Sequence, residues 1–274
     1  MISQDSPKSS DFSGSRVADR FGVENVTQRF GGSIALEKVS LTIKAGERVA
    51  LVGPSGAGKT TLLRLLNGTI QPTEGNVQVG GVDLSKLSSS DLRSIRSQIG
   101  FVHQDLSLVP NVRVSQNIIS GKLGQRSFFS SLRAWFLPGK KDLLRTHEIL
   151  ERVGIPEKLF QRTDSLSGGQ QQRVGIARAL FQEPRSILAD EPVSSVDPAR
   201  ARDTVELLTD ICREREVTLI MSLHNLELAR EFFPRLIGIR NGKIAFDHGS
   251  DRVDDTCFHR LFDLKEDEMM NDGA

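Results

Sequence analysis

The first part of the chain alternates apolar and polar residues at the spacing of half-buried β-strands. Gly31-Gly32 and Ala45-Gly46 interrupt this alternation, and residues 49–52 form a run that is apolar throughout. Residues 77–79 add a further strand before a turn at Gly80-Gly81. The pattern predicts an antiparallel layer beside a buried strand, with inward positions at Val23, Val26, Leu36, Val39, Leu41 and Ile43.

Strand signals are sparse in the middle of the chain, where helical spacing dominates. We expect a mostly helical subdomain over about residues 105–165. The elements predicted in and before it are a helix over residues 91–98, a short buried strand over 100–102, and helices over 117–119 and 143–153.

An aromatic stripe inside this subdomain is spaced as one face of a helix. Such stripes are most often buried, so we interpret it as a core face of the helical subdomain. The alternative is a docking surface for a membrane partner, because exposed aromatic patches mark interfaces. The stripe consists of Phe128, Phe129, Leu132, Trp135 and Phe136, flanked by Arg126, Arg133, Lys140 and Lys141.

The last third returns to alternating helices and strands, which is typical of an α/β domain. Asp197-Pro198 supplies a helix N-cap followed by proline at the first helical position. Asn241-Gly242 predicts a tight hairpin turn. The predicted elements are helices over residues 170–181, 198–215 and 226–232, and strands over 187–189, 218–222, 236–239 and 243–246.

Composition narrows the class of protein. The 274 residues are 38% hydrophobic and 26% charged, enough for a sizeable core. The formal net charge of +1 gives no global attraction to nucleic acid or anionic lipid, so we expect no nucleic-acid partner. Cys212 and Cys257 are the only cysteines, which indicates a reducing compartment. No apolar run reaches the ~20 residues of a membrane span. We expect residues 1–20 to be a disordered leader and 263–274 a frayed acidic tail.

Between the buried strand and a helical run lies a phosphate-binding loop. Its residues match the pattern G-x-x-x-x-G-K-[ST] in the strand–loop–helix context that the motif requires. Backbone N–H groups and the positive helix end face the phosphates, while the lysine reaches the β- and γ-phosphates and the threonine hydroxyl binds Mg²⁺. The loop comprises Gly53, Pro54, Ser55, Gly56, Ala57, Gly58, Lys59, Thr60 and Thr61.

Two consecutive carboxylates follow a second buried strand. Asp190 and Glu191 come directly after residues 186–189, at the strand end where ligands bind in open α/β sheets. Beside a phosphate-binding loop, we assign Asp190 to the Mg²⁺ shell and Glu191 to polarising the attacking water.

A second anion-binding helix start carries the resemblance to a known family. Ser167 is a suitable N-cap, and Gly168 and Gly169 leave backbone N–H groups open. The stretch Leu166-Ser167-Gly168-Gly169-Gln170 resembles the signature of ATP-binding cassette (ABC) proteins. This resemblance covers about residues 21–262. It implies one α/β P-loop NTPase domain with a RecA-like core, an antiparallel β subdomain and a helical subdomain, and the cofactors ATP and Mg²⁺.

The resemblance also implies roles for further residues. Gln104 resembles the Q-loop glutamine that senses Mg²⁺ and the γ-phosphate, and His224 resembles the switch histidine. Ser194-Ser195-Val196-Asp197 resembles the D-loop, which places Asp197 at the nucleotide; Ser195-Val196 stands where Ala-Leu is more usual. Phe30 lies where the family carries an aromatic residue, often tyrosine, that stacks on adenine. This chain has no tyrosine, and phenylalanine keeps the π-face.

In the resembling family two cassettes sandwich ATP between the phosphate-binding loop of one and the signature of the other. The chain is therefore expected to form a homodimer or pair with a similar cassette, on the cytoplasmic face of the cell membrane, attached to transmembrane permease subunits and indirectly served by an extracytoplasmic solute-binding protein. ATP contacts both cassettes only when they are closed, so it favours closure.

Several stretches resemble the ATPases of phosphonate importers, so the expected cargo is a phosphonate or a related phosphorus oxyanion. An importer of another small solute such as amino acids, a non-transport ABC ATPase and a module that binds ATP without turnover stay as alternatives. The stretches are Phe101-Val102-His103-Gln104-Asp105, Leu108-Val109-Pro110, Gly121-Lys122-Leu123-Gly124, Arg152-Val153-Gly154-Ile155, Leu188-Ala189-Asp190-Glu191-Pro192-Val193 and Ser222-Leu223-His224.

Overall fold

The computed structural model describes residues 19–125, 127–193 and 197–262, whose strands form two sheets. One is a four-stranded antiparallel sheet in the order β2-β1-β4-β5, and the other a six-stranded sheet in the order β10-β9-β3-β8-β7-β6. The strands are β1 (Asp19–Phe30), β2 (Ser33–Lys44), β3 (Arg48–Val52), β4 (Glu74–Val79), β5 (Val82–Asp83), β6 (Ile99–Val102), β7 (Ser186–Ala189), β8 (Thr218–Leu223), β9 (Arg235–Arg240) and β10 (Lys243–Gly249).

The antiparallel sheet confirms the layer expected from the alternating pattern. β1 and β2 pair from Asp19↔Lys44 to Phe30↔Ser33, and β4 pairs with the other edge of β1. The predicted leader is too long by two residues, because Asp19 and Arg20 belong to β1 and Arg20 is only 8% exposed. The rest of that predicted leader, residues 1–18, and the predicted tail, 263–274, lie outside the described residues.

The large sheet is parallel along β6, β7, β8, β3 and β9, with β10 antiparallel at one edge. Its central strands are buried on both faces, as expected for strands covered by helices. The predicted hairpin is confirmed: Asn241 and Gly242 connect β9 to β10 with φ of 48° and 73°, the left-handed pair that a tight two-residue turn requires.

Helix α1 (Lys59–Leu66) lies between the two sheets, as both views show. Its four leucines, Leu62, Leu63, Leu65 and Leu66, are fully buried in one core with residues of both sheets. The helix ends before Gly68, whose φ of 65° suits a residue without Cβ. The phosphate-binding loop is thus mounted on a rigid helix that is anchored in the core.

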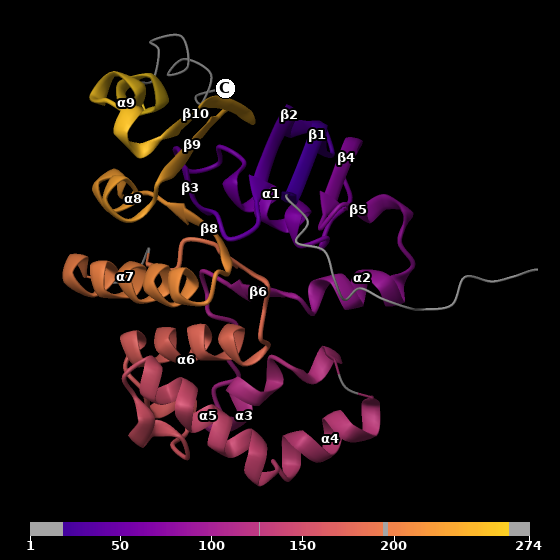
Figure 1. Ribbon diagram of the computed structural model, residues 1–274, viewed down its shortest axis with the longest axis vertical. Coiled ribbons are helices and arrows are strands. Elements are labelled where there is room, and N and C mark those ends of the chain that lie inside the picture. Colours follow the sequence, from indigo (N-terminus) through magenta and orange to yellow (C-terminus); the bar gives the residue numbers. More distant parts are fainter. Residues whose placement is uncertain (1–18, 126, 194–196, 263–274) are drawn as a thin grey trace, which may run out of the picture.

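Helix α2 packs through Leu92 and Ile95 against the same core as α1, whereas the helices from α3 to α9 contribute to the core on the other side of the large sheet. In Figure 1, α3, α4, α5 and α6 gather in the lower part of the molecule. Helix α9 was not predicted. The helices are α2 (Ser89–Arg96), α3 (Val114–Ser120), α4 (Phe128–Phe136), α5 (Lys140–Arg152), α6 (Gly168–Phe181), α7 (Pro198–Glu214), α8 (Leu226–Phe232) and α9 (Asp255–Phe262), with 3₁₀ turns at Leu84–Lys86, Leu123–Gln125, Pro156–Lys158, Thr163–Ser165 and Ser250–Arg252.

Helix α4 carries the aromatic stripe, and the core interpretation of that stripe is wrong. Phe129 is 82% exposed and Phe136 67%, whereas among the α4 side chains that the structure describes the buried one is Ala134, which lies off the stripe. Leu132 is also exposed, Trp135 is half-buried, and the side chain of Phe128 lies outside the described part. A helix that packs through a small residue turns its large ones outward, a choice that periodicity alone does not reveal.

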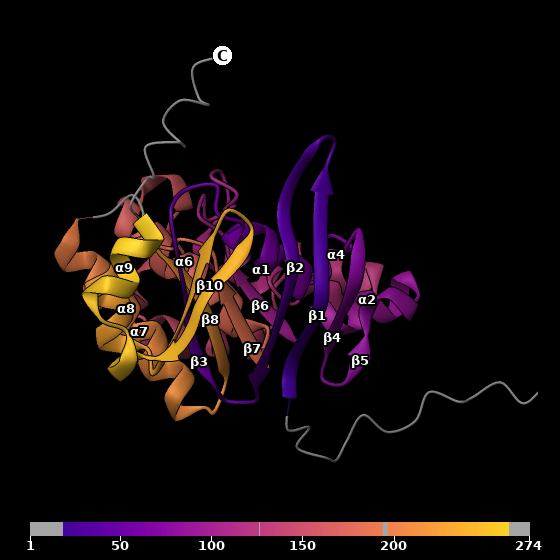
Figure 2. The same ribbon diagram turned by 90° about the horizontal axis from the view of Figure 1, so that it is seen from above.

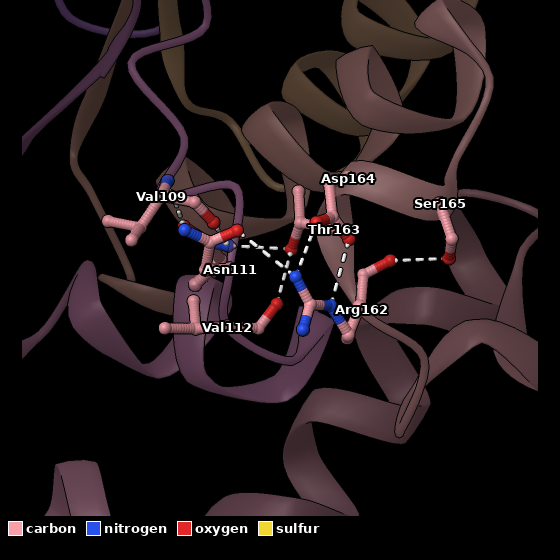
Figure 3. A network of polar contacts seen from close by, with 8 residues as sticks. Val109, Asn111, Val112, Arg162, Thr163, Asp164 and Ser165 are labelled. Carbon is pink, nitrogen blue, oxygen red and sulfur yellow. Dashed lines mark hydrogen bonds and ion pairs between the residues drawn. The ribbon is translucent and has the colours of Figure 1, made fainter.

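A buried polar network joins the loop that follows Gln104 to the segment that precedes the signature (Figure 3). The side chain of Asn117, fully buried on α3, accepts the N–H of Val109 at 2.9 Å and donates to Val109 O at 2.9 Å and Thr163 Oγ1 at 2.7 Å. Thr163 Oγ1 donates in turn to Val112 O at 3.0 Å. At the exposed end, Arg162 donates to Asn111 Oδ1. These bonds fix the loop after Gln104 to the segment that precedes the signature.

Candidate active site

The phosphate-binding loop has the backbone geometry that its glycines predict. Gly53 has φ of 151°, and a Cβ there would lie 2.1 Å from Ile239 O. Gly58 has φ of 109°, and a Cβ there would lie 2.6 Å from Ala35 O. The loop is braced from the β9–β10 turn as well, because Gly242 N donates to Ala57 O at 3.1 Å. With α1 starting at Lys59, the free N–H groups of its first turn face the loop, which makes this an anion-binding cradle.

Lys59 is buried, and its side chain reaches back to the start of this cradle. Its ammonium donates to Gly53 O at 2.8 Å and Pro54 O at 3.0 Å, and lies 3.5 Å from Glu191 Oε1. Burial lowers the pKa of Lys59 from its usual value, partly offset by the nearby Glu191 carboxylate. The buried positive charge is therefore held by the loop and by the predicted catalytic base.

Asp190 lies at the carboxyl end of β7 and faces the loop threonine. Thr60 Oγ1 donates to Asp190 Oδ1 at 3.0 Å, and Ser222 Oγ donates to the same oxygen at 2.9 Å. The Asp190 N–H is bonded to Val102 O. Asp190 is 6% exposed, so its carboxylate is oriented by two hydroxyls rather than by water.

Glu191 has a left-handed backbone, with φ of 45°. Its N–H donates to Ser222 Oγ at 2.8 Å, and its Oε1 lies 2.6 Å from His224 Nε2. The Glu191 carboxylate therefore lies between His224 and Lys59, close to the loop that holds phosphates. The sequence predicted Glu191 as the base that polarises water, and that role stays a prediction; its contacts with His224 and Lys59 were not predicted.

The oxygens of Thr60 and Asp190 fit Mg²⁺. Mg²⁺ prefers hard oxygen ligands and takes only one or two from the protein, with the rest from phosphates and water. A hydroxyl and a carboxylate in contact beside the cradle meet that need. Among the described residues no three His, Cys, Asp or Glu side chains gather around a metal position.

The signature segment is a separate helix start. Ser167 Oγ accepts from Gln170 N at 3.4 Å and Gln170 Oε1 accepts from Ser167 N at 3.1 Å, a capping box that leaves Gly168 and Gly169 between them. Ser167 and Gly168 are exposed. This confirms the predicted cap, and its bonds are internal to the segment.

The other predicted site residues are not gathered at the cradle by any contact in the described ranges. Gln104 is exposed after β6, and Phe30 is 50% exposed at the end of β1. Asp197 caps α7 by accepting from Arg200 N at 3.1 Å, as predicted for a cap, while its role at a nucleotide stays a prediction. Ser194-Ser195-Val196 lie outside the described residues.

Three polar residues near the site were not predicted. Ser222 precedes His224 by two positions at the end of β8, and this spacing was a signal that it shares the face of His224. Gln172 on α6 donates to Pro192 O, just after Glu191. Arg178, also on α6, donates to Leu106 O and Ser107 O of the loop after Gln104. Gln172 and Arg178 thus connect α6 to the segment after Glu191 and to the loop after Gln104. Sequence spacing does not reveal such contacts.

The family is clear from the comparison with known sequences. The profile described as "ABC transporter" matches residues 36–194, which contain the cradle, both carboxylates and the signature. The chain belongs to the ABC transporter family, and its fold is that of a solved ATP-binding cassette.

Within that family, several similar relatives share one name. A protein of Wolinella succinogenes named "Phosphonates import ATP-binding protein PhnC" is 42% identical over 245 residues, which is 89% of this chain and 88% of the relative. Proteins with that name, numbered PhnC 2 in Cupriavidus metallidurans and PhnC 1 in Pseudomonas savastanoi pv. phaseolicola, are 44% and 48% identical, covering 93% and 81% of this chain and 91% and 83% of their own.

Solved cassettes have the same fold. The dimeric post-hydrolysis structure of the ATP-binding cassette MJ0796, bound to ADP and Pi, superposes with a TM-score of 0.74 at 32% identity, over 84% of this chain and 98% of that one. The cassette cbiO1 from Clostridium perfringens, part of the transporter complex cbiONQ, gives 0.73 at 25% identity, over 93% and 94%.

Proposed function

We propose that this chain is the ATP-hydrolysing subunit of an importer for phosphonates or a related phosphorus oxyanion. One observation carries the catalytic part: Glu191 lies between His224 and Lys59, next to the Thr60–Asp190 pair. The cargo class rests on the shared name of relatives that are 40–48% identical over most of the chain.

In this proposal each residue of the site has a role that its contacts support. The N–H groups of the cradle and Lys59 bind the β- and γ-phosphates of ATP. Glu191 accepts a proton from the attacking water, while His224 orients the Glu191 carboxylate and reaches toward the γ-phosphate. Thr60 and Asp190 would hold Mg²⁺, which neutralises charge on the transferred phosphoryl group. Gln104, which follows β6 at the same sheet edge, acts as a sensor of the phosphate.

A second copy of this chain completes the site in our proposal. The predicted signature residues, Ser167 to Gln170, form their own helix start, and the similar cassette MJ0796 is a dimer in its post-hydrolysis structure. Mixing two inactive variants, Lys59→Ala and Gly168→Arg, tests this. If ATP binds between two chains, about half the dimers are mixed and each regains one intact site, so about a quarter of the wild-type rate returns. No recovery, with mixed dimers shown to form, contradicts the shared site.

The exposed face of α4 is our candidate contact for a membrane subunit of that importer. Phe129, Leu132 and Phe136 are exposed, as are the cations Arg133 on the same helix and Lys140 and Lys141 at the start of α5. No acidic residue occurs between residues 123 and 141, so the face suits an apolar cytoplasmic segment that carries acidic side chains. No helix in the described ranges has the length and apolar character needed for a membrane crossing.

Two serine substitutions test this contact. Phe129→Ser with Phe136→Ser should release the chain from co-expressed membrane subunits and leave its basal ATPase rate unchanged. Phe160→Ser, at a phenylalanine that is 60% exposed outside α4, is the matched control. Retention of the α4 double variant in the membrane complex contradicts this placement of the contact.

The catalytic proposal is tested by Glu191→Gln. Loss of a general base lowers turnover by about 10²–10⁴-fold, and we expect an ATP-stabilised dimer to accumulate because binding is retained. A wild-type rate in this variant excludes Glu191 as the base. A wild-type chain that binds ATP and never hydrolyses it would support the alternative of a module without turnover.

The cargo is tested apart from the chemistry. The tagged chain is recovered from its native membranes, and the solute-binding protein of the same system is titrated by calorimetry with methylphosphonate, phosphite, phosphate and an amino-acid mixture. Tight binding of a phosphonate or phosphite, with ATPase stimulation in the reconstituted complex, supports the cargo class. An amino acid as the ligand keeps the importer and replaces its cargo. Absence of any membrane partner favours a non-transport ABC ATPase.

A further inference from the structure

Ser222 is a buried serine whose hydroxyl contacts both carboxylate residues of the site. It lies in β8 and is fully buried. Its Oγ accepts the backbone N–H of Glu191 at 2.8 Å and donates to Asp190 Oδ1 at 2.9 Å. One side-chain atom therefore connects the predicted base to the residue that faces Thr60.

The strand register explains why this serine reaches both. β7 and β8 are parallel neighbours, and the last pair of their ladder is Ala189↔Met221. Asp190 and Ser222 each come one residue later, at the carboxyl ends of adjacent strands. A hydroxyl has one proton and two lone pairs. When the Ser222 hydroxyl donates its proton to Asp190 Oδ1, a lone pair of the same oxygen accepts the Glu191 N–H. One orientation of the hydroxyl therefore makes both bonds.

The backbone of Glu191 shows what the second bond holds. Its φ of 45° is uncommon for a residue with a side chain. In this conformation Oε1 lies 2.6 Å from His224 Nε2 and 3.5 Å from Lys59 Nζ. The bond from the Glu191 N–H to Ser222 Oγ is made in the same conformation, so it favours the arrangement that places the carboxylate between the two nitrogens.

We propose that Ser222 is a positioning residue for ATP hydrolysis, which sets the Glu191 carboxylate and the Asp190 carboxylate at once through a single hydroxyl. The proposal rests on the ATPase function proposed above. Ser222 touches neither the cradle nor Lys59 in the described contacts. Its removal therefore acts on turnover and on the use of Mg²⁺, and much less on the binding of ATP.

The experiment compares Ser222→Ala with the wild-type chain. Displacement of a catalytic group by a fraction of an ångström to ~1 Å lowers the rate by about 10–100-fold, so we expect kcat to fall in that range, with KM for ATP changed by less than about threefold. The Mg²⁺ concentration for half-maximal rate should rise. Independently of turnover, Mg²⁺ should tighten ADP binding less in the variant than in the wild type, as measured by calorimetry.

Two further variants separate positioning from simple loss of a buried hydrogen bond. Ser222→Thr restores a hydroxyl at the same atom, so kcat should recover at least partly. Thr218→Val removes another buried hydroxyl of β8, which accepts from Gly46 N at 2.9 Å at the opposite end of the strand. This control should lose a similar amount of thermal stability and keep its kcat and its Mg²⁺ dependence.

The outcomes are distinguishable. A wild-type kcat and Mg²⁺ dependence in a folded Ser222→Ala variant overturns the proposal. An equal loss of kcat in Thr218→Val also overturns it, since the effect would then be general to the strand. If Ser222→Thr does not fold, the contrast of Ser222→Ala with Thr218→Val still decides. If the wild-type chain hydrolyses no ATP, the proposed function fails, whereas ADP titration with and without Mg²⁺ still tests the Asp190 contact.

Discussion

Asn117 is the residue whose replacement gives the clearest test of how the loop after Gln104 is held. The amide is fully buried, and each of its polar atoms is bonded: Oδ1 accepts from Val109 N, and Nδ2 donates to Val109 O and Thr163 Oγ1. Asn117→Ala removes three buried hydrogen bonds and leaves the Val109 N–H without its acceptor. It also leaves a small cavity.

The magnitude follows from these contacts. A hydrogen bond contributes about 0.5–1.5 kcal/mol net, so three contribute about 1.5–4.5 kcal/mol, and we expect about 3 kcal/mol lost from the free energy of unfolding. That is a large share of the roughly 5–15 kcal/mol of a typical domain. Thr163 Oγ1 keeps its bond to Val112 O, which limits the loss on that side.

The assay is equilibrium unfolding in urea followed by circular dichroism, with Asn111→Ala as the control. Asn111 has the same side chain in the same network, but it is exposed and bonded only to Arg162 among the described contacts. The control should lose less than about 0.5 kcal/mol. Equal losses in the two variants, or a loss well below the ~1.5 kcal/mol lower bound for Asn117→Ala, would refute the view that this buried amide fixes the loop to the signature segment.

Other predictions follow from single contacts. Lys59→Ala should weaken ATP binding by about 10–100-fold in calorimetry, because it removes a charged donor worth about 1.5–3 kcal/mol; unchanged affinity contradicts the role of the cradle. Phe30→Ala should weaken ATP binding by about tenfold and Phe30→Tyr by little, if the half-exposed ring stacks on adenine. Burial raises the pKa of the Cys212 thiol to about 12, so at neutral pH this cysteine is protonated and should react with a thiol reagent only after unfolding; rapid modification in the native protein contradicts its burial.

Sequence reasoning found the groups whose position depends on local chemistry. The glycines of the phosphate-binding loop, the cap at Asp197 and the turn at Asn241-Gly242 each follow from backbone constraints within a few residues, and the structure confirms their conformations. Asp190 and Glu191 were found because a buried strand delivers them to the edge where ligands bind.

The missed features depend on packing between distant segments. The spacing of Ser222 from His224 was a local signal, but its contact with Asp190 depends on the register of β8 against β7, which that spacing does not specify. The stripe on α4 has a correct helical period, yet the packing of Ala134 turned it outward. Arg178 reaches carbonyls of a loop that is 71 and 72 positions away in the sequence. Hydrophobic periodicity and composition therefore predicted the helices and strands. They did not predict which face of each helix or strand packs against which neighbour.

Some predicted site residues are in contact within this chain, and others belong to elements that lie apart from them. Lys59, Asp190, Glu191 and His224 follow the carboxyl ends of the parallel strands β3, β7 and β8, so one sheet edge brings them into contact within a single chain. Phe30 belongs instead to the antiparallel sheet, and Ser167 begins a separate helix whose preceding segment is tied to the loop after Gln104 through Asn117 and Thr163. Variants of the first group therefore change contacts within one chain, whereas the mixing of Lys59→Ala with Gly168→Arg tests the role that we propose for the signature in a second chain.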